Sequence, residues 1–547
     1  MYHNLRTFLK LSMLQKIAIA LFLFIVWVLF HSALLTYGTG AIPLHKTHIG
    51  DEQSPINAGL HILKDRDILS IRNSGTYYGP IMGTLSIPAA VGDFGARYLN
   101  NEIETISDYQ NLLVWDWGGV IVFARLISLL AGFLGLVALY LIVKELIPKK
   151  KYLYPTVFSV LLLATNLIYF EYSSFFRFWI FMEAILLWQL YLLILITKQK
   201  ISPRFGFRAS AVLGVLSFGL VYLSVIFQAF WLPYLYTWLK NMDRKMLIGF
   251  VQFSITYVVG AILIIVWYPD PFFRVFKMGL SPESVSGPTS IVDPLAYYGS
   301  LLLTGSAPLL LALLLLLAFY YKHTSQDIKR FIFAILMTIV AYSSLLLFVG
   351  WREGRYFLPL SVLLVVLVSV LLGSQRTADL IYVRQIFIKR VVLLLLALQV
   401  CFGAFIAFKT YQIYDSDPSE IAIIKSFDPS ERIVVIRIRF YGMNELVGVA
   451  HNKKAYDLYF KLMNLDSLDY FGYLMTTEPP STESTYDIYY TNFGTLKLQK
   501  EVLISADHYV SCYHPIWDGT SLGDPFNRNV FQLFYPKAMN EECFILK

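Results

Sequence analysis

The sequence predicts an all-α polytopic membrane protein that ends in a small mixed α/β domain. Hydrophobic residues make up 57% of the 547 positions and charged residues only 15%. The mean hydropathy is +0.58, an apolar excess too large for the core of one soluble domain. Apolar runs near the ~20-residue length that crosses a bilayer recur from about residue 15 to about residue 410.

These runs define the predicted spans. They lie at about residues 15–37, 118–146, 153–171, 177–197, 247–267, 296–320, 330–350, 354–373 and 389–410. The segment 209–240 is either one long tilted helix or two short helices that break near Leu223-Ser224. Two short helices would put the basic loops on the side of the N-terminus, as the positive-inside tendency favours. We therefore predict about eleven spans and a cytoplasmic N-terminus, with loop 38–117, loop 268–294 and the tail from about residue 411 outside.

The charge distribution agrees with this topology. The formal net charge is +8, but residues 411–547 hold 12 Lys+Arg against 18 Asp+Glu. The basic excess therefore belongs to the membrane part, where it sits in short loops between spans and sets orientation. This pattern argues against nucleic acid as a partner.

The first outer loop carries the candidate reaction centre, Asp51-Glu52. Ser54 and Pro55 suit the start of a helix lying along the membrane surface. One interpretation is that the two carboxylates only complement the positive end of that helix. The other is catalytic, because adjacent carboxylates at a membrane surface offer a proton acceptor and a cation ligand.

Two charges lie inside apolar runs, Arg125 and Glu183. Counted from the predicted outer ends of their spans, both are ~9–11 Å deep at 1.5 Å per residue. A lone charge in hydrocarbon costs at least ~2.5 kcal/mol, so we expect the two to form an ion pair. A structural role is favoured over substrate contact, because matched depth needs no ligand.

Arginines on the outer side are candidates for binding phosphate. Arg352 and Arg355 fall between two spans where the positive-inside tendency would disfavour them, and Arg177 lies in the short turn before another span. A guanidinium group matches phosphate oxygens, although an interfacial anchor would have the same composition. Glu171 is either the salt-bridge partner of Arg177 or a second acidic group of the site.

The tail is predicted to be a separate domain. Arg432 to Phe440 alternates like a strand. Before it, Asp417-Pro418-Ser419-Glu420 combines a capping residue, a first-turn proline and a third-position carboxylate, which indicates the start of a helix. We divide the chain into a membrane-embedded domain, 1–410, and an extracytoplasmic α/β domain, 411–547. Spacing does not decide whether Cys512 and Cys543 form a disulfide.

Taken in order, several motifs resemble the membrane-embedded glycosyltransferases of superfamily C. The resemblance covers most of residues 10–375 and is nearest to the branch of protein O-mannosyltransferases, the lipid A aminoarabinose transferase and related polyprenyl-phosphate-sugar-dependent transferases. It is carried by Asp51-Glu52, Ala58, Leu63, Tyr78-Gly79-Pro80, Ala90, Arg125-Leu126-Ile127-Ser128, Ser173-Ser174, Arg177 and Arg355-Tyr356-Phe357-Leu358-Pro359.

The resemblance implies an inverting transferase that uses a sugar on a polyprenyl or dolichyl phosphate. Asp51 matches the family's catalytic base and Glu52 an assisting position. Some relatives need a divalent cation, for which Glu171 is the available second acidic ligand, so metal dependence stays open. The expected partners are a lipid-linked sugar donor, membrane lipids and an acceptor of unidentified class. We expect the plasma membrane of a bacterium rather than the endoplasmic reticulum.

Two other functions fit the same composition. One is a transporter or flippase of lipid-linked sugars, although no internal repeat is visible and the notable charges lie near one face. The other is an oligosaccharide ligase or polymerase that uses similar donors. The size of the cavity beside Asp51 would separate that option from transfer of a single sugar.

Overall fold

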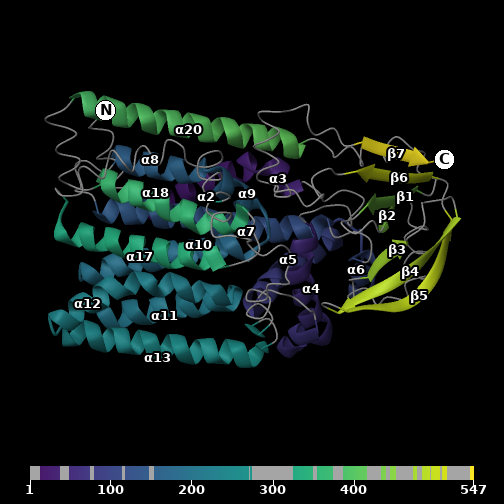
Figure 1. Ribbon diagram of the computed structural model, residues 1–547, viewed down its shortest axis with the longest axis horizontal. Helices are drawn as coiled ribbons and strands as arrows, with labels where there is room; N and C mark the ends of the chain where they lie inside the picture. The colour runs from purple at the N-terminus through teal and green to yellow at the C-terminus, as the bar shows by residue number, and fades with distance from the viewer. Residues whose placement is uncertain are drawn as a thin grey trace.

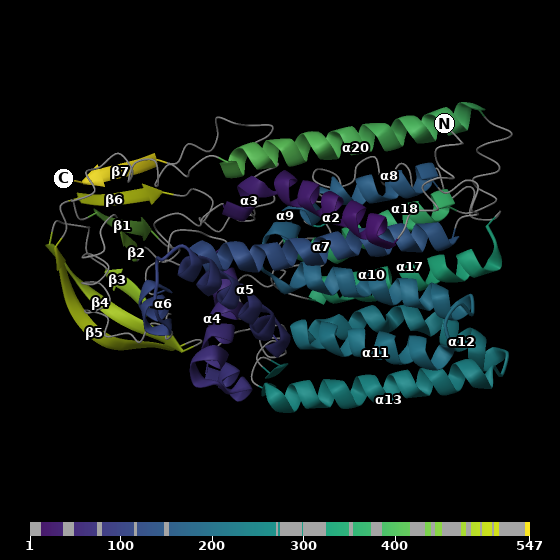
Figure 2. The same cartoon turned by 180° about the vertical axis from the view of Figure 1, so that it is seen from behind.

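The computed structural model describes residues 13–36, 49–73, 79–113, 118–146, 153–269, 272–273, 298, 324–348, 354–373 and 386–415, and seven strands between residues 433 and 546. Helices account for most of the described chain before residue 416. In Figures 1 and 2 the long helices run side by side along the long axis, with α4 and α5 set across one end and the strands beyond them.

The helices of the first half are α2 (Met13–Phe30), α3 (Ser32–Thr36), α4 (Ile49–Asp65), η1 (Ile68–Asn73), α5 (Pro80–Leu99), α6 (Ile106–Leu113), α7 (Gly118–Leu146), α8 (Leu153–Ala164), α9 (Leu167–Ser174) and α10 (Phe178–Thr197). They are followed by α11 (Pro203–Leu220), η2 (Tyr222–Trp231), α12 (Leu232–Lys240), α13 (Arg244–Trp267), α17 (Gln326–Phe348), η5 (Gly354–Phe357), α18 (Leu358–Gly373) and α20 (Ile386–Asp415).

Within the described residues, four helices are long and apolar enough to cross a membrane: α7, α10, α13 and α17. The pair α8 and α9 adds a fifth if its 61° bend is counted within one span. The helices differ in how much of their most apolar 18-residue stretch is buried, which is 67% in α10 but only 22% in α13. Helix α10 is therefore central, and α13 exposes its apolar side chains at the edge, as a lipid-facing helix does. The predicted total of about eleven spans includes the run 296–320, almost all of which lies outside the described residues.

The ambiguous segment 209–240 is broken into shorter elements. Helix α11 ends at Leu220, and the next residue, Val221, has an extended backbone with φ −153° and ψ 127°, two residues before the predicted break. The 3-10 helix η2 then leads into α12. Pro233 lies in the first turn of α12, where a proline is tolerated because the backbone N–H groups of a first turn have no partner within the helix.

Seven strands follow the last helix. They are β1 (Ile433–Ile438), β2 (Asn444–Ala450), β3 (Gly472–Thr476), β4 (Glu483–Asn492), β5 (Thr495–Ser505), β6 (His508–Tyr513) and β7 (Glu542–Leu546). Their order in the sheet is β5-β4-β3-β2-β1-β6-β7, and the pairing of β1 with β6 is parallel. The register sets Cys512 opposite Cys543. A disulfide between them, and the division of the chain at residue 410, stay predictions.

Candidate functional site

The candidate site begins at α4, the helix that carries Asp51 and Glu52. The helix was expected to start at Ser54, but it starts at Ile49, so both acidic residues lie in its first turn. Pro55 is therefore inside the helix, where it has no N–H to donate to the carbonyl of Asp51 four residues earlier. Ser86 of α5 donates from Oγ to the carbonyl oxygen of Pro55 at 3.0 Å, which ties this turn of α4 to α5. The side chain of Asp51 lies outside the described part of the structure.

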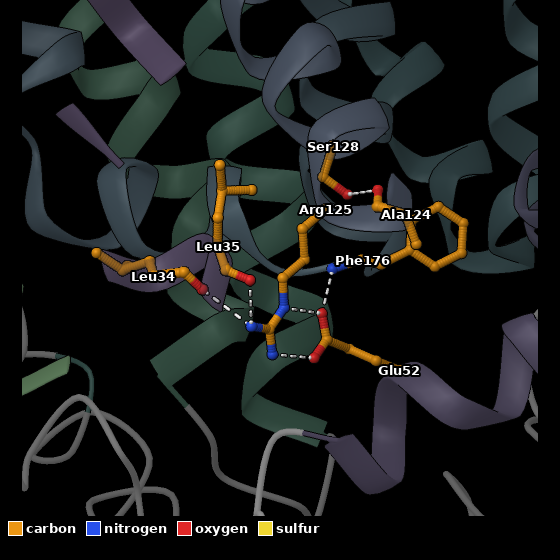
Figure 3. A network of polar contacts seen from close by, with 7 residues as sticks. All are labelled: Leu34, Leu35, Glu52, Ala124, Arg125, Ser128 and Phe176. Carbon is orange, nitrogen blue, oxygen red and sulfur yellow. Dashed lines mark hydrogen bonds and ion pairs between the residues drawn. The ribbon is translucent and has the colours of Figure 1, made fainter. Parts of the chain in front are cut away.

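Glu52 forms a bidentate ion pair with Arg125 of α7. Nε of Arg125 donates to Oε1 of Glu52 at 3.0 Å, and Nη2 donates to Oε2 at 2.7 Å. Both side chains are completely buried. The backbone N–H of Phe176, between α9 and α10, donates to the same Oε1 at 2.7 Å. Figure 3 shows both oxygens of Glu52 facing the guanidinium group.

Arg125 also bonds to the end of α3. Nη1 donates to the carbonyl oxygens of Leu34 and Leu35 at 2.9 Å and 3.0 Å (Figure 3). The guanidinium carbon also lies 5.2 Å from the centroid of the Phe175 ring. A buried ion pair is stable only when additional hydrogen bonds satisfy its other polar atoms, and here backbone groups do so. One arginine thus connects α3, α4, α7 and the turn before α10.

The predicted ion pair between Arg125 and Glu183 is wrong. Glu183 is completely buried on α10, but neither of its carboxylate oxygens has a hydrogen-bond partner among the described residues. The reason is the register between α7 and α10. A Cβ built on Gly132 of α7 would lie 3.5 Å from Ile180 of α10. Arg125 is two helical turns outward from Gly132, which places it level with Phe175 rather than with Glu183.

Arg177 and Glu171 lie close along the chain to this ion pair. Arg177 precedes α10 with an extended backbone, and Glu171 belongs to α9. Both are buried, at 5% and 1% exposure. The backbone N–H of Phe176 is hydrogen-bonded to Glu52, and Arg177 is the next residue in the chain, so Arg177 lies beside the ion pair of Glu52 and Arg125. The backbone of Arg355 lies in η5, but its side chain and the whole of Arg352 lie outside the described residues.

A second polar cluster fixes the start of α7 and was not predicted. Nε of Arg97 donates to Oδ1 of Asp93 at 3.0 Å, and the hydroxyl of Tyr109 donates to Oδ2 at 2.9 Å. A Cβ built on Gly119 would lie 1.9 Å from Oδ1 of Asp93, so only glycine fits at this contact. The glycine pair that opens the apolar run, Gly118-Gly119, was the available signal in the sequence.

An apolar pocket lies among α10, η2, α17 and η5. It is lined by Trp179, Met182, Phe227, Tyr342, Leu346 and Tyr356. The hydroxyl of Tyr342 donates to the carbonyl oxygen of Tyr356 at 3.0 Å, which closes one side of the pocket with a satisfied polar group. Among the described residues, no three His, Cys, Asp or Glu side chains stand close enough to hold a metal ion.

No protein-family model matches this chain, and no curated protein matches it. The arrangement of Glu52, Arg125 and the Phe175–Arg177 turn is therefore the basis for a functional conclusion.

Proposed function

We propose that the protein is an inverting glycosyltransferase that moves a sugar from a polyprenyl or dolichyl phosphate to an acceptor on the extracytoplasmic side of the membrane. The observation that carries the proposal is the completely buried ion pair between Glu52 and Arg125, directly beside Asp51 in the chain. A general base must be held firmly within hydrogen-bond reach of the proton it removes. The pair fixes the first turn of α4 against α7 and so fixes the backbone that carries Asp51.

This geometry divides the roles of the two carboxylates. Oε1 of Glu52 accepts hydrogen bonds from Arg125 and Phe176, and Oε2 accepts one from Arg125. Both oxygens of Glu52 are thus already occupied by buried donors, so neither is placed to take the proton of an acceptor hydroxyl. We therefore assign Glu52 a positioning role and Asp51 the role of base.

The proposed reaction is a single displacement. The carboxylate of Asp51 takes the proton of an acceptor hydroxyl while the hydroxyl oxygen attacks the anomeric carbon. The bond from that carbon to the phosphate oxygen breaks on the opposite face, and the lipid phosphate leaves with the electron pair. Arg177, Arg352 and Arg355 are proposed to stabilise the negative charge on this leaving group.

The membrane character of the chain supports a lipid-linked donor. Several helices are long and apolar enough to cross a bilayer, so a donor carried on a membrane lipid would reach this part of the chain within its own membrane. The finer parts of the proposal are about eleven spans, a cytoplasmic N-terminus, residence in a bacterial plasma membrane and a C-terminal extracytoplasmic domain.

The test follows release of the lipid phosphate. Membranes containing the protein are incubated with a panel of undecaprenyl-phosphate-linked sugars together with envelope extract as a source of acceptor. Release of undecaprenyl phosphate is measured by mass spectrometry. Asp51→Asn should abolish this release without loss of folded protein, because the amide cannot accept the proton. The matched control is Asp65→Asn, an exposed carboxylate at the other end of α4, which should leave the release unchanged.

Two results would contradict the proposal. Near-normal release by Asp51→Asn would remove Asp51 from the mechanism. Movement of intact lipid-linked sugar across sealed vesicles, without release of lipid phosphate, would indicate a transporter instead.

A further inference from the structure

Figure 1 shows that α11 and α13 begin, and α12 ends, at the end of the helix bundle that lies away from the strands. Five basic residues belong to these helix ends by their positions in the sequence. All five are exposed. They are Arg204, Arg208, Lys240, Arg244 and Lys245, and we call them the basic patch.

Phe207 brings the three helices of the basic patch together. Its ring centroid lies 5.5 Å from that of Trp238 in α12. A Cβ built on Gly249 of α13 would lie 2.4 Å from the same ring, so the α13 backbone contacts Phe207 directly. Arg208 follows Phe207, Lys240 follows Trp238 by two positions, and Lys245 precedes Gly249 by one helical turn. The packing around Phe207 therefore brings the helix ends that carry the basic patch to the same end of the bundle.

No residue of the basic patch forms an ion pair with another described residue. Two other cations, exposed Lys200 and half-buried Arg330, do have partners. Lys200 forms a salt bridge with Glu145, and Arg330 lies 3.7 Å from Asp327. The carboxylate nearest to the basic patch in the chain is Asp243, whose Oδ1 accepts the N–H of Met246 as the cap of α13. The patch thus has little internal neutralisation.

Helix geometry makes this arrangement unfavourable for the isolated protein. Arg204 lies in the first turn of α11, and Arg244 and Lys245 lie in the first turn of α13. Neither turn contains an acidic residue. The N-terminal end of a helix carries partial positive charge, so it disfavours cations and favours anions. Ser202 caps α11 with a neutral hydroxyl and Asp243 caps α13, so five cations stand beside one carboxylate, and an external anion would neutralise the remaining positive charge.

Apolar side chains lie among the cations and indicate the source of that anion. Phe205, Leu239 and Met242 are 63%, 52% and 71% exposed. Each is within one turn of a basic patch residue along the chain. Cations mixed with exposed aromatic and aliphatic side chains suit the interface of a bilayer, where apolar groups enter the hydrocarbon and charged groups stay at headgroup level. A soluble anion would not contact the exposed apolar side chains, so they would contribute nothing to its binding.

We propose that the basic patch binds the phosphate headgroups of anionic phospholipids in the leaflet that this end of the bundle faces. The guanidinium groups of three arginines match the oxygens of a phosphodiester, and Phe205, Leu239 and Met242 pack against the upper acyl chains. The proposal does not depend on the glycosyltransferase function.

The test measures lipid retention by the full-length protein. The protein is purified in detergent, offered equal amounts of phosphatidylglycerol and phosphatidylcholine, and examined by native mass spectrometry. The test variant carries R204Q, R208Q, K240Q, R244Q and K245Q. The control variant carries K64Q and R66Q, two exposed cations at the C-terminal end of α4, at the opposite end of the bundle.

Wild type and control should retain more phosphatidylglycerol than phosphatidylcholine, and the test variant should lose this preference. The apparent affinity for phosphatidylglycerol should fall by at least about tenfold, because each basic side chain near an anionic surface contributes a factor of about five. Phosphatidylcholine retention by the test variant should match wild type, which shows that its lipid-facing surface is intact.

Three outcomes would overturn the proposal. The first is an unchanged preference for phosphatidylglycerol in the test variant, which would mean that these cations only set the orientation of the protein in the membrane. The second is an equal loss in the control, which would mean that net charge and not this patch decides. The third is complete displacement of phosphatidylglycerol by inorganic phosphate at the same concentration, which would indicate a site for a soluble anion.

Discussion

Removal of Arg125 should destabilise the protein strongly. Arg125→Met leaves the completely buried Glu52 with one described donor, the N–H of Phe176, and takes the donor away from two carbonyl oxygens at the end of α3. Breaking a buried pair by removing one partner typically costs about 3–5 kcal/mol, because an uncompensated charge stays behind. We therefore expect a loss of that size in the free energy of unfolding, measured by denaturant titration in mixed micelles at pH 7.

A double-mutant cycle separates the ion pair from the packing. Glu52→Gln should also destabilise, but the double variant with Arg125→Met should be more stable than the sum of the single effects predicts, by about 1–3 kcal/mol. The control is Lys200→Met, which breaks a salt bridge whose lysine is 51% exposed. An exposed pair contributes at most about 1 kcal/mol. A loss below about 1 kcal/mol for Arg125→Met, or additive single effects, would refute the claim that this pair holds α4 in place.

Two further predictions concern the elements around the site. Gly119→Ala should destabilise by about 1–3 kcal/mol in the same titration, because its Cβ would lie 1.9 Å from a held carboxylate oxygen of Asp93. Gly95→Ala, where nothing lies within 4 Å, should instead stabilise by about 0.5–1 kcal/mol, and equal effects of the two changes would contradict the packing argument. The hydroxyl and N–H of Thr105 lower the pKa of Asp108 at the start of α6. Its carboxylate therefore stabilises α6 above the usual pKa of 3.8 and loses that contribution as the pH falls through the lowered value. The hydrogen-exchange protection factors of α6, corrected for the intrinsic exchange rate at each pH, should fall below about pH 4 in wild type but not in Asp108→Asn, and identical profiles would exclude this cap.

The local parts of the fold were predictable, since length and hydropathy are properties of short segments. The runs 118–146 and 177–197 correspond closely to α7 and α10. The run 153–171 was not a simple span, because Asn166 interrupts it. The side chain of Asn166 accepts the N–H of Tyr169 and so caps α9, and its Nδ2 donates to Ser361 of α18. A polar residue with a cap geometry in the middle of an apolar run was the signal for the 61° bend.

The partner of Arg125 was not predictable from depth alone. Counting residues from the predicted end of each helix assumes that α7 and α10 begin at the same level, but the closeness of Gly132 to Ile180 shows that the N-terminal end of α7 extends about three turns beyond that of α10. That extension brings Arg125 to the level of α4, outside the part of the bundle that contains Glu183. Much of what satisfies Arg125 is backbone, and carbonyl or N–H groups have no sequence pattern of their own. The same extension has a functional consequence. A charge that was expected to pair with another helix of the bundle instead anchors α4, the helix that carries Asp51, so the position of the proposed base depends on the register of α7 against α10.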